Sequence, residues 1–181
     1  YFDVSRWGAC LNVSFDEFRD TQSLDDYLSP MKALAAALAD RPRAMEGVRL
    51  FIVHHATAEV LGLLKACADA GCDSLATFFV QYAGVVPDAY LETLMSLPPE
   101  EFRFYGLRKM ETRAKLGGLY TLARDLTPHT GLEDVDQALL DEEPDFLDAM
   151  RLASGHLFLK EVERARSDNR RMLLVEDGGY L

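Results

Sequence analysis

An apolar run that turns abruptly polar limits the folds open to this chain more than any other feature. Val48–Val53 is rich in β-branched residues and has no helical period, which predicts a buried strand. His54 and His55 follow, and a helical spacing begins at Thr57, the expected N-cap; Glu59 lies in the first turn, where the helix dipole favours negative charge. Open α/β sheets place ligands where a strand ends before a helix N-terminus.

Strands and helices alternate along the rest of the chain. The predicted strands are 48–53, 75–80, 101–105 and 171–175. This alternation predicts one α/β domain over residues 1–181, a three-layer, Rossmann-like (flavodoxin-like) open sheet that is mainly parallel, with helices on both faces. Residues 1–22 are expected to be irregular, and residues 111–170 mostly helical.

Composition excludes several classes of partner. The formal net charge of −11 argues against a nucleic-acid or anionic-membrane surface, because such partners need clustered Lys and Arg. No apolar run reaches the roughly 18 residues of a membrane span, and we expect no signal peptide. Cys10, Cys67 and Cys72 show no Cys-x-x-Cys spacing, which favours reduced thiols. We therefore expect a cytoplasmic protein.

Three segments resemble one enzyme family. His55-x-Thr57-x-Glu59, after a strand that opens with Gly47–Leu50, resembles the substrate-domain motif of S-adenosylhomocysteine hydrolases, which reads Gly-Ala-Arg-Ile and then His-Met-Thr-x-Glu-Thr. Two further segments match in the same order: Ser5–Gly8, which resembles Ala-Trp-Gly, and Met172–Gly179, which is similar to Met-Ile-Leu-Asp-Asp-Gly-Gly-Asp. The resemblance implies a substrate-binding domain for an adenosine-type ligand, in which NAD chemistry serves thioether hydrolysis.

The resemblance also implies roles for individual residues. His55 matches a histidine that assists proton transfer near the ribose 5′ position, and imidazole titrates near neutrality as a general acid or base should. Asp177 matches an aspartate at the reacting ribose, and its Gly-Gly neighbours let backbone approach a ligand closely. Thr57 and Glu59 match adenine contacts, and Asp88 matches a substrate-binding aspartate. We expect the strand ends that carry His55 and Asp177 to share one edge of the sheet.

The chain departs from the family pattern at several places. Residues 82–87 read Tyr-Ala-Gly-Val-Val-Pro where the family has Asn-x-x-Ser-Thr-Gln, so only Asp88 matches there. Tyr180 replaces a carboxylate, and the helical segment over 111–170 is an insertion between the third and fourth strands. No Gly-x-Gly-x-x-Gly occurs among the twelve glycines. We therefore expect this chain to bind no NAD and to need an NAD-binding domain or partner chain for activity.

Other interpretations stay open. His54 and His55 could be structural, and Thr57 and Glu59 could act only as helix caps. A metal site built from His54, His55, His129 and Glu59 matches no known ligand spacing, so no metal is expected. The second hypothesis is a non-catalytic relative of the family, a binding or assembly module. Self-association into a homo-oligomer is also among the expectations.

Overall fold

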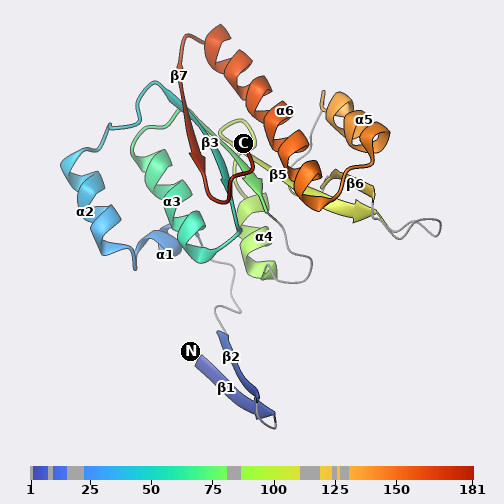
Figure 1. The fold of residues 1–181 in the computed structure, drawn as a ribbon. Coiled ribbons are helices and arrows are strands. Elements are labelled where there is room, and N and C mark those ends of the chain that lie inside the picture. The colour runs from blue at the N-terminus through green and yellow to red at the C-terminus, as the bar shows by residue number, and fades with distance from the viewer. Residues whose placement is uncertain are drawn as a thin grey trace.

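The computed structural model describes residues 2–7, 10–15, 23–80, 87–110, 119–123, 126 and 131–181, without the side chains of residues 2–15 and of Asp88 (Figure 1). The strands of the described residues are β1 (Phe2–Trp7), β2 (Cys10–Phe15), β3 (Val48–His54), β4 (Ser74–Phe79), β5 (Phe102–Met110), β6 (Leu119–Leu122) and β7 (Arg171–Glu176). The helices are α1 (Leu24–Leu28), α2 (Lys32–Asp40), α3 (Ala58–Asp69), α4 (Asp88–Met95), α5 (Glu133–Glu142) and α6 (Phe146–Ser167).

Strands β1 and β2 form an antiparallel pair in which Phe2 is opposite Phe15 and Val4 is opposite Val13. The expectation of an irregular segment over residues 1–22 was therefore wrong for these two stretches. Both sequences alternate apolar and polar residues for several positions, which is the period of a strand with one buried face.

The remaining strands form one sheet in the order β6-β5-β4-β3-β7. Neighbours among β5, β4, β3 and β7 are parallel, and β6 is antiparallel to β5. The prediction of an α/β chain with a mainly parallel sheet is confirmed, and the arrangement is compatible with a Rossmann-like fold. The flavodoxin-like order was wrong: β5 lies beyond β4, and the chain crosses to the other side of β3 only with β7.

Helices cover both faces of this sheet (Figure 1). Leu50 and Ile52 of β3 pack in one core with α1, α3 and α4. Phe51 and Val53, which alternate with them, pack in a second core with α5 and α6. This arrangement gives three layers, because a strand buried on both faces needs apolar partners above and below it.

Burial falls from the centre of the sheet to its β7 edge. Every residue of β4 is buried, and β3 is buried over most of its length. In β7, by contrast, Leu173 and Leu174 are 43% and 38% exposed. All three strands have apolar sequences, so their different burial follows from the order of the strands rather than from composition.

The segment between β5 and β7 is only partly helical. β5 runs to Met110, well beyond the predicted strand over 101–105, and β6 then pairs with it antiparallel from Leu119 to Leu122. The prediction of a mostly helical segment over residues 111–170 fits α5 and α6 but missed β6. No helix of the described residues has the length and apolar character needed to cross a membrane.

Candidate functional site

The carboxyl ends of β3 and β7 lie side by side. Val53 pairs with Glu176 in parallel register, and the Asp177 amide donates to the Val53 carbonyl at 3.0 Å. The strand ends carrying His55 and Asp177 therefore share one edge of the sheet, as the sequence predicted. β4 lies on one side of β3 and β7 on the other, so this edge is the point where the strand order reverses. Ligands of open α/β sheets bind at such a point.

The imidazole that contacts Asp177 is that of His54, not His55. His54 Nε2 lies 3.3 Å from Asp177 Oδ2, and His54 Nδ1 lies 3.2 Å from the His55 carbonyl oxygen. Both ring nitrogens thus face acceptor oxygens, and the tautomer of the ring decides which nitrogen donates. The sequence predicted a proton-transfer role for His55 and none for His54. His54 is the last residue of β3 and keeps the alternation of Leu50 and Ile52, which directs its ring to the α3 side of the sheet.

Helix α3 begins beside these histidines. Thr57 is its N-cap, with extended backbone angles of φ −122° and ψ 162°, so the predicted start is confirmed. The Thr57 hydroxyl makes no cap hydrogen bond, and the half-buried side chain is therefore not committed to the helix. Glu59 lies in the first turn and is exposed. A hydroxyl and a carboxylate are thus available on the same side of the sheet as His54.

The turn after β7 is shaped by Tyr180. Gly178 has a φ of +123°, and a Cβ atom there would lie 2.4 Å from the Tyr180 ring. Tyr180 is itself buried in the core beneath α5 and α6, and its amide donates to Glu176 Oε1 at 2.6 Å. The tyrosine ring therefore requires glycine at position 178. The expectation that this Gly-Gly pair admits a ligand fails at Gly178, because the space above it is filled.

The site residues near the end of β4 lie mostly outside the described part of the chain. Residues 81–86, which include most of the stretch that departs from the family, are not described. Asp88 begins α4 directly after Pro87, its N-cap, but the aspartate side chain is outside the described residues. His129, the remaining member of the metal hypothesis, is also outside them. Elsewhere in the described ranges, no three His, Cys, Asp or Glu side chains converge as a metal ion would require.

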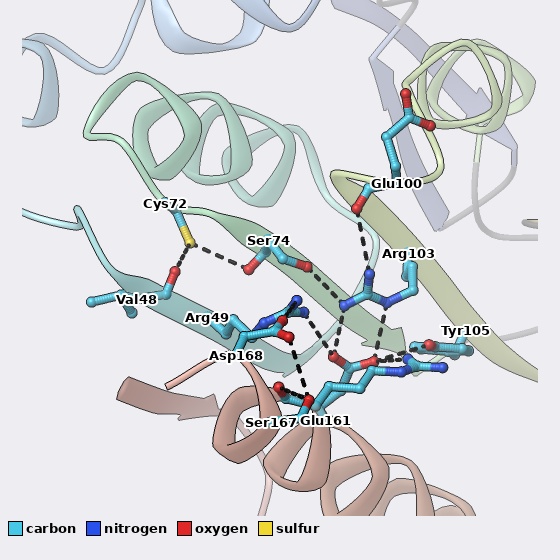
Figure 2. Close-up of polar contacts among 11 residues, drawn as sticks. Val48, Arg49, Cys72, Ser74, Glu100, Arg103, Tyr105, Glu161, Ser167 and Asp168 are labelled. Atoms are coloured by element: carbon cyan, nitrogen blue, oxygen red, sulfur yellow. Dashed lines mark hydrogen bonds and ion pairs between the residues drawn. The ribbon is translucent and has the colours of Figure 1, made fainter. Parts of the chain in front are cut away.

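A second polar cluster lies near the amino ends of the strands, opposite the candidate site (Figure 2). It was not predicted from the sequence. Glu161 of α6 is 1% exposed and accepts from Arg103 Nη2 at 2.6 Å and from Arg164 Nη1 at 2.5 Å. Tyr105 donates its hydroxyl to Glu161 Oε1 at 3.3 Å, and Arg49 Nη1 lies 4.0 Å from Glu161 Oε2. One buried carboxylate thus joins side chains from the first halves of β3 and β5 to α6.

Neighbouring side chains pair further atoms of Arg103 and Arg49, while Arg49 Nε and Nη1 stay buried without a hydrogen bond to the described residues. Ser74 Oγ accepts from Arg103 at 2.7 Å, and Arg49 forms an ion pair with Asp168. Burial, and next the Glu161 carboxylate, raise the pKa of Tyr105, so its phenol stays a donor at neutral pH. We interpret the cluster as structural, since its carboxylate is committed to the protein on every side. The one sequence signal was that Glu161 continues the buried i, i+4 row of α6.

A pocket of about 440 Å³ lies along α6. Its lining includes Lys160, Arg164 and Ser167 together with Glu163, so both signs of charge are present. None of the residues that the sequence proposed for a site lines it. We therefore take the carboxyl edge at β3 and β7 as the candidate site. In comparisons with known proteins, no protein-family model, no curated protein and no solved structure matches this chain.

Proposed function

We propose that this chain is an adenosylhomocysteinase-like substrate domain that binds an adenosine-type molecule at the carboxyl edge of its sheet. The observation that carries the proposal is the 3.3 Å contact between His54 Nε2 and Asp177 Oδ2, at the point where the strand order reverses. Acid–base side chains at such a point are the usual material of a binding or catalytic site.

The charge at this edge favours a neutral or cationic ligand. The N-terminus of α3 would ordinarily attract a phosphate, but Glu59 lies in its first turn and Asp177 has a half-exposed carboxylate nearby along the edge. An anionic ligand would therefore meet like charges. A nucleoside without phosphate carries hydroxyl and amine groups that can donate to these carboxylates.

The proposed roles follow the resemblance, with one addition. Glu59 and Thr57 would bind the base, and Asp177 and His55 would act at the ribose, with Asp88 as a further substrate contact. His54 is the addition: because it contacts Asp177, it would orient that carboxylate. In a complete enzyme the hydride chemistry would belong to NAD, and these side chains would bind the ligand and move protons.

We expect adenosine to bind more tightly than inosine by about 5- to 150-fold, which corresponds to about 1–3 kcal/mol for a mispaired acceptor that the bound ligand covers. The Glu59 carboxylate can accept from the exocyclic amine of adenosine but meets only a keto oxygen in inosine. In Glu59→Gln the amide can either accept or donate, so the preference should disappear. Isothermal titration of both nucleosides would measure it.

Glu163→Gln is the matched control, since Glu163 is exposed on α6 and is no part of this site. It should keep the wild-type preference. Equal affinity of the wild-type chain for the two nucleosides would remove Glu59 from the role of adenine contact. Absence of binding to either nucleoside would contradict the proposal as a whole.

The same chain should not bind NAD with micromolar affinity. A pyrophosphate needs a glycine-rich turn that allows close backbone approach, and the turn between β3 and α3 holds His55, Ala56 and Thr57. Glu59 in the next turn would also repel the phosphates. The β3–α3 turn therefore does not fit this cofactor. Tryptophan or NADH fluorescence during titration would reveal a complex, and saturation below about 10 μM would contradict the prediction.

A second candidate function is a non-catalytic binding or assembly module. The observation in its favour is that Tyr180, at the position where the family has a second carboxylate, is a core residue that closes the turn after β7. A reacting ribose would then lack one acidic neighbour. Normal nucleoside binding together with no exchange of the ribose 4′ hydrogen, in the presence of an added NAD-binding partner, would favour this module over an enzyme.

A further inference from the structure

One edge of strand β7 is open within the part of the chain that the structure describes. Within the described ranges it pairs only with β3. The Arg171 amide donates to Gly47 and the Asp177 amide to Val53, so odd-numbered residues direct their main-chain groups to β3. The amides and carbonyls of Met172, Leu174 and Glu176 therefore point outward. A row of unpaired strand groups of this kind is a template for pairing with another chain.

The side chains along this edge are apolar where a solvated edge would carry charge. Leu173 is 43% exposed on the α3 side of the sheet, and Leu174 is 38% exposed on the α6 side. The strand contains no proline and no lysine, the residues with which proteins usually protect such edges. Its charges stand at the two ends, Arg171 at one and Glu176 with Asp177 at the other.

We propose that β7 pairs antiparallel with β7 of a second copy of this chain, and that the two sheets join across a two-fold axis at Leu174. A hydrogen-bonded pair across the two copies needs main-chain groups that point outward from both strands, and in β7 these belong to Met172, Leu174 and Glu176. A dyad at Leu174 meets this condition: Leu174 is opposite its own copy, and Met172 is opposite Glu176. This pairing requires no ligand at the candidate site.

Charge and shape agree with this register. Arg171 is opposite Asp177 of the other copy, and the symmetry makes this opposite-charge pair twice. The Asp177 side chain is 59% exposed even while it contacts His54, so an arginine of another chain can reach it. Leu173 is opposite Val175, which covers the exposed leucine on the α3 side. The arginine of one copy thus enters the candidate site of the other.

Helix α6 offers apolar surface beside the same edge. Ser154 Oγ donates to the Tyr180 carbonyl at 3.1 Å, just past the end of β7, so this flank of α6 lies on the β7 side. Phe158 of α6 and Met172 of β7 both pack against the same core. Leu147, two turns before Ser154, is 51% exposed. Figure 1 shows α6 and β7 as neighbours along one side of the sheet. Two copies joined at β7 would bring these flanks toward each other.

Light scattering after size exclusion tests the proposal on the whole chain. Wild type should have twice the 20.3 kDa mass of one chain. Leu174→Lys places two like charges at the axis and should give the single-chain mass, as should Arg171→Asp; adding Asp177→Arg to the latter should restore the dimer. Leu140→Lys, a substitution of another exposed leucine on α5, should leave the dimer intact.

A disulfide tests the register without relying on the charged variants. Hydrogen-bonded antiparallel pairs have Cα atoms about 5.5 Å apart, within disulfide range, so Leu174→Cys should cross-link under mild oxidation. Met172→Cys, which would face Glu176, should not. Burial raises the pKa of Cys67 to about 12, which keeps that native thiol unreactive. Oxidation of the wild-type chain measures any cross-linking by the other native cysteines, Cys10 and Cys72. A single-chain mass for wild type, a dimer that survives Leu174→Lys, or equal cross-linking at 172 and 174 would overturn the proposal.

Discussion

Glu161→Ala is expected to lower the free energy of unfolding by about 3–5 kcal/mol, because it leaves buried arginine charge without its partner. Arg103 loses both of its bonds to this carboxylate, at 3.1 and 2.6 Å, and its side chain is only 16% exposed. Tyr105 and Arg164 lose an acceptor as well. For a chain of this length the loss corresponds to a fall of about 6–20 °C in the melting temperature. Thermal and urea unfolding followed by circular dichroism would measure it.

Two further variants distinguish the loss of the carboxylate charge from the effect of placing alanine in α6. Glu161→Gln keeps the size of the side chain and one acceptor oxygen, so its loss should lie between those of wild type and Glu161→Ala. Glu163→Ala removes an exposed glutamate two positions along the same helix and should change stability by no more than about 0.5 kcal/mol. If Glu161→Ala proved as mild as Glu163→Ala, the cluster would not hold α6 to the sheet.

Gly62→Ala should destabilise the chain by about 1–3 kcal/mol, although alanine is the better helix former. Gly62 lies inside α3, where a Cβ atom would be 2.5 Å from Met31 Sδ and 2.7 Å from the Tyr27 carbonyl oxygen. The methionine side chain can move, but the second contact is with backbone. α1 crosses α3 against this glycine, so the methyl group would force the two helices apart.

Gly155→Ala is the matched substitution with the opposite expected sign. Gly155 lies inside α6, and a Cβ atom there would meet nothing within 4 Å. Alanine should therefore stabilise the chain by up to about 1 kcal/mol through helix propensity alone. Urea unfolding of both variants gives the comparison. A stabilising Gly62→Ala would show that α1 does not pack on α3 as closely as described.

Much of the fold was predictable because its signals are local. The apolar run over 48–53 became β3, and Thr57 became the N-cap of α3. Gly71 lies just past the end of α3: its φ is +83°, and the Cys72 and Gly71 amides donate to the Cys67 and Ala68 carbonyls. These bonds form the αL ending that a glycine just past a helix indicates. Each of these features depends on a few neighbouring residues.

The sequence predicted where the candidate site lies in the sheet but not which side chains meet there. Parallel strands release their carboxyl ends at one edge, so the meeting of the β3 and β7 ends followed from the strand pattern. Which imidazole contacts Asp177 depends on strand alternation and on where β3 ends. The resemblance gave a role to His55 alone, whereas the structure brings His54 to the carboxylate. The role of Gly178 also depended on the tertiary structure, because the glycine there leaves room for the Tyr180 ring.

The sequence by itself determined the alternation of strands and helices, the start and end of α3 and the edge that gathers polar residues, because periodicity and capping act over a few residues. Only the tertiary structure decided that apolar β7 is an edge strand and that Glu161 gathers arginines. Arg103 is 58 positions from Glu161, and Arg49 is 119 positions from Asp168. Contacts across such separations depend on strand order and helix placement, and no local pattern in the chain encodes them.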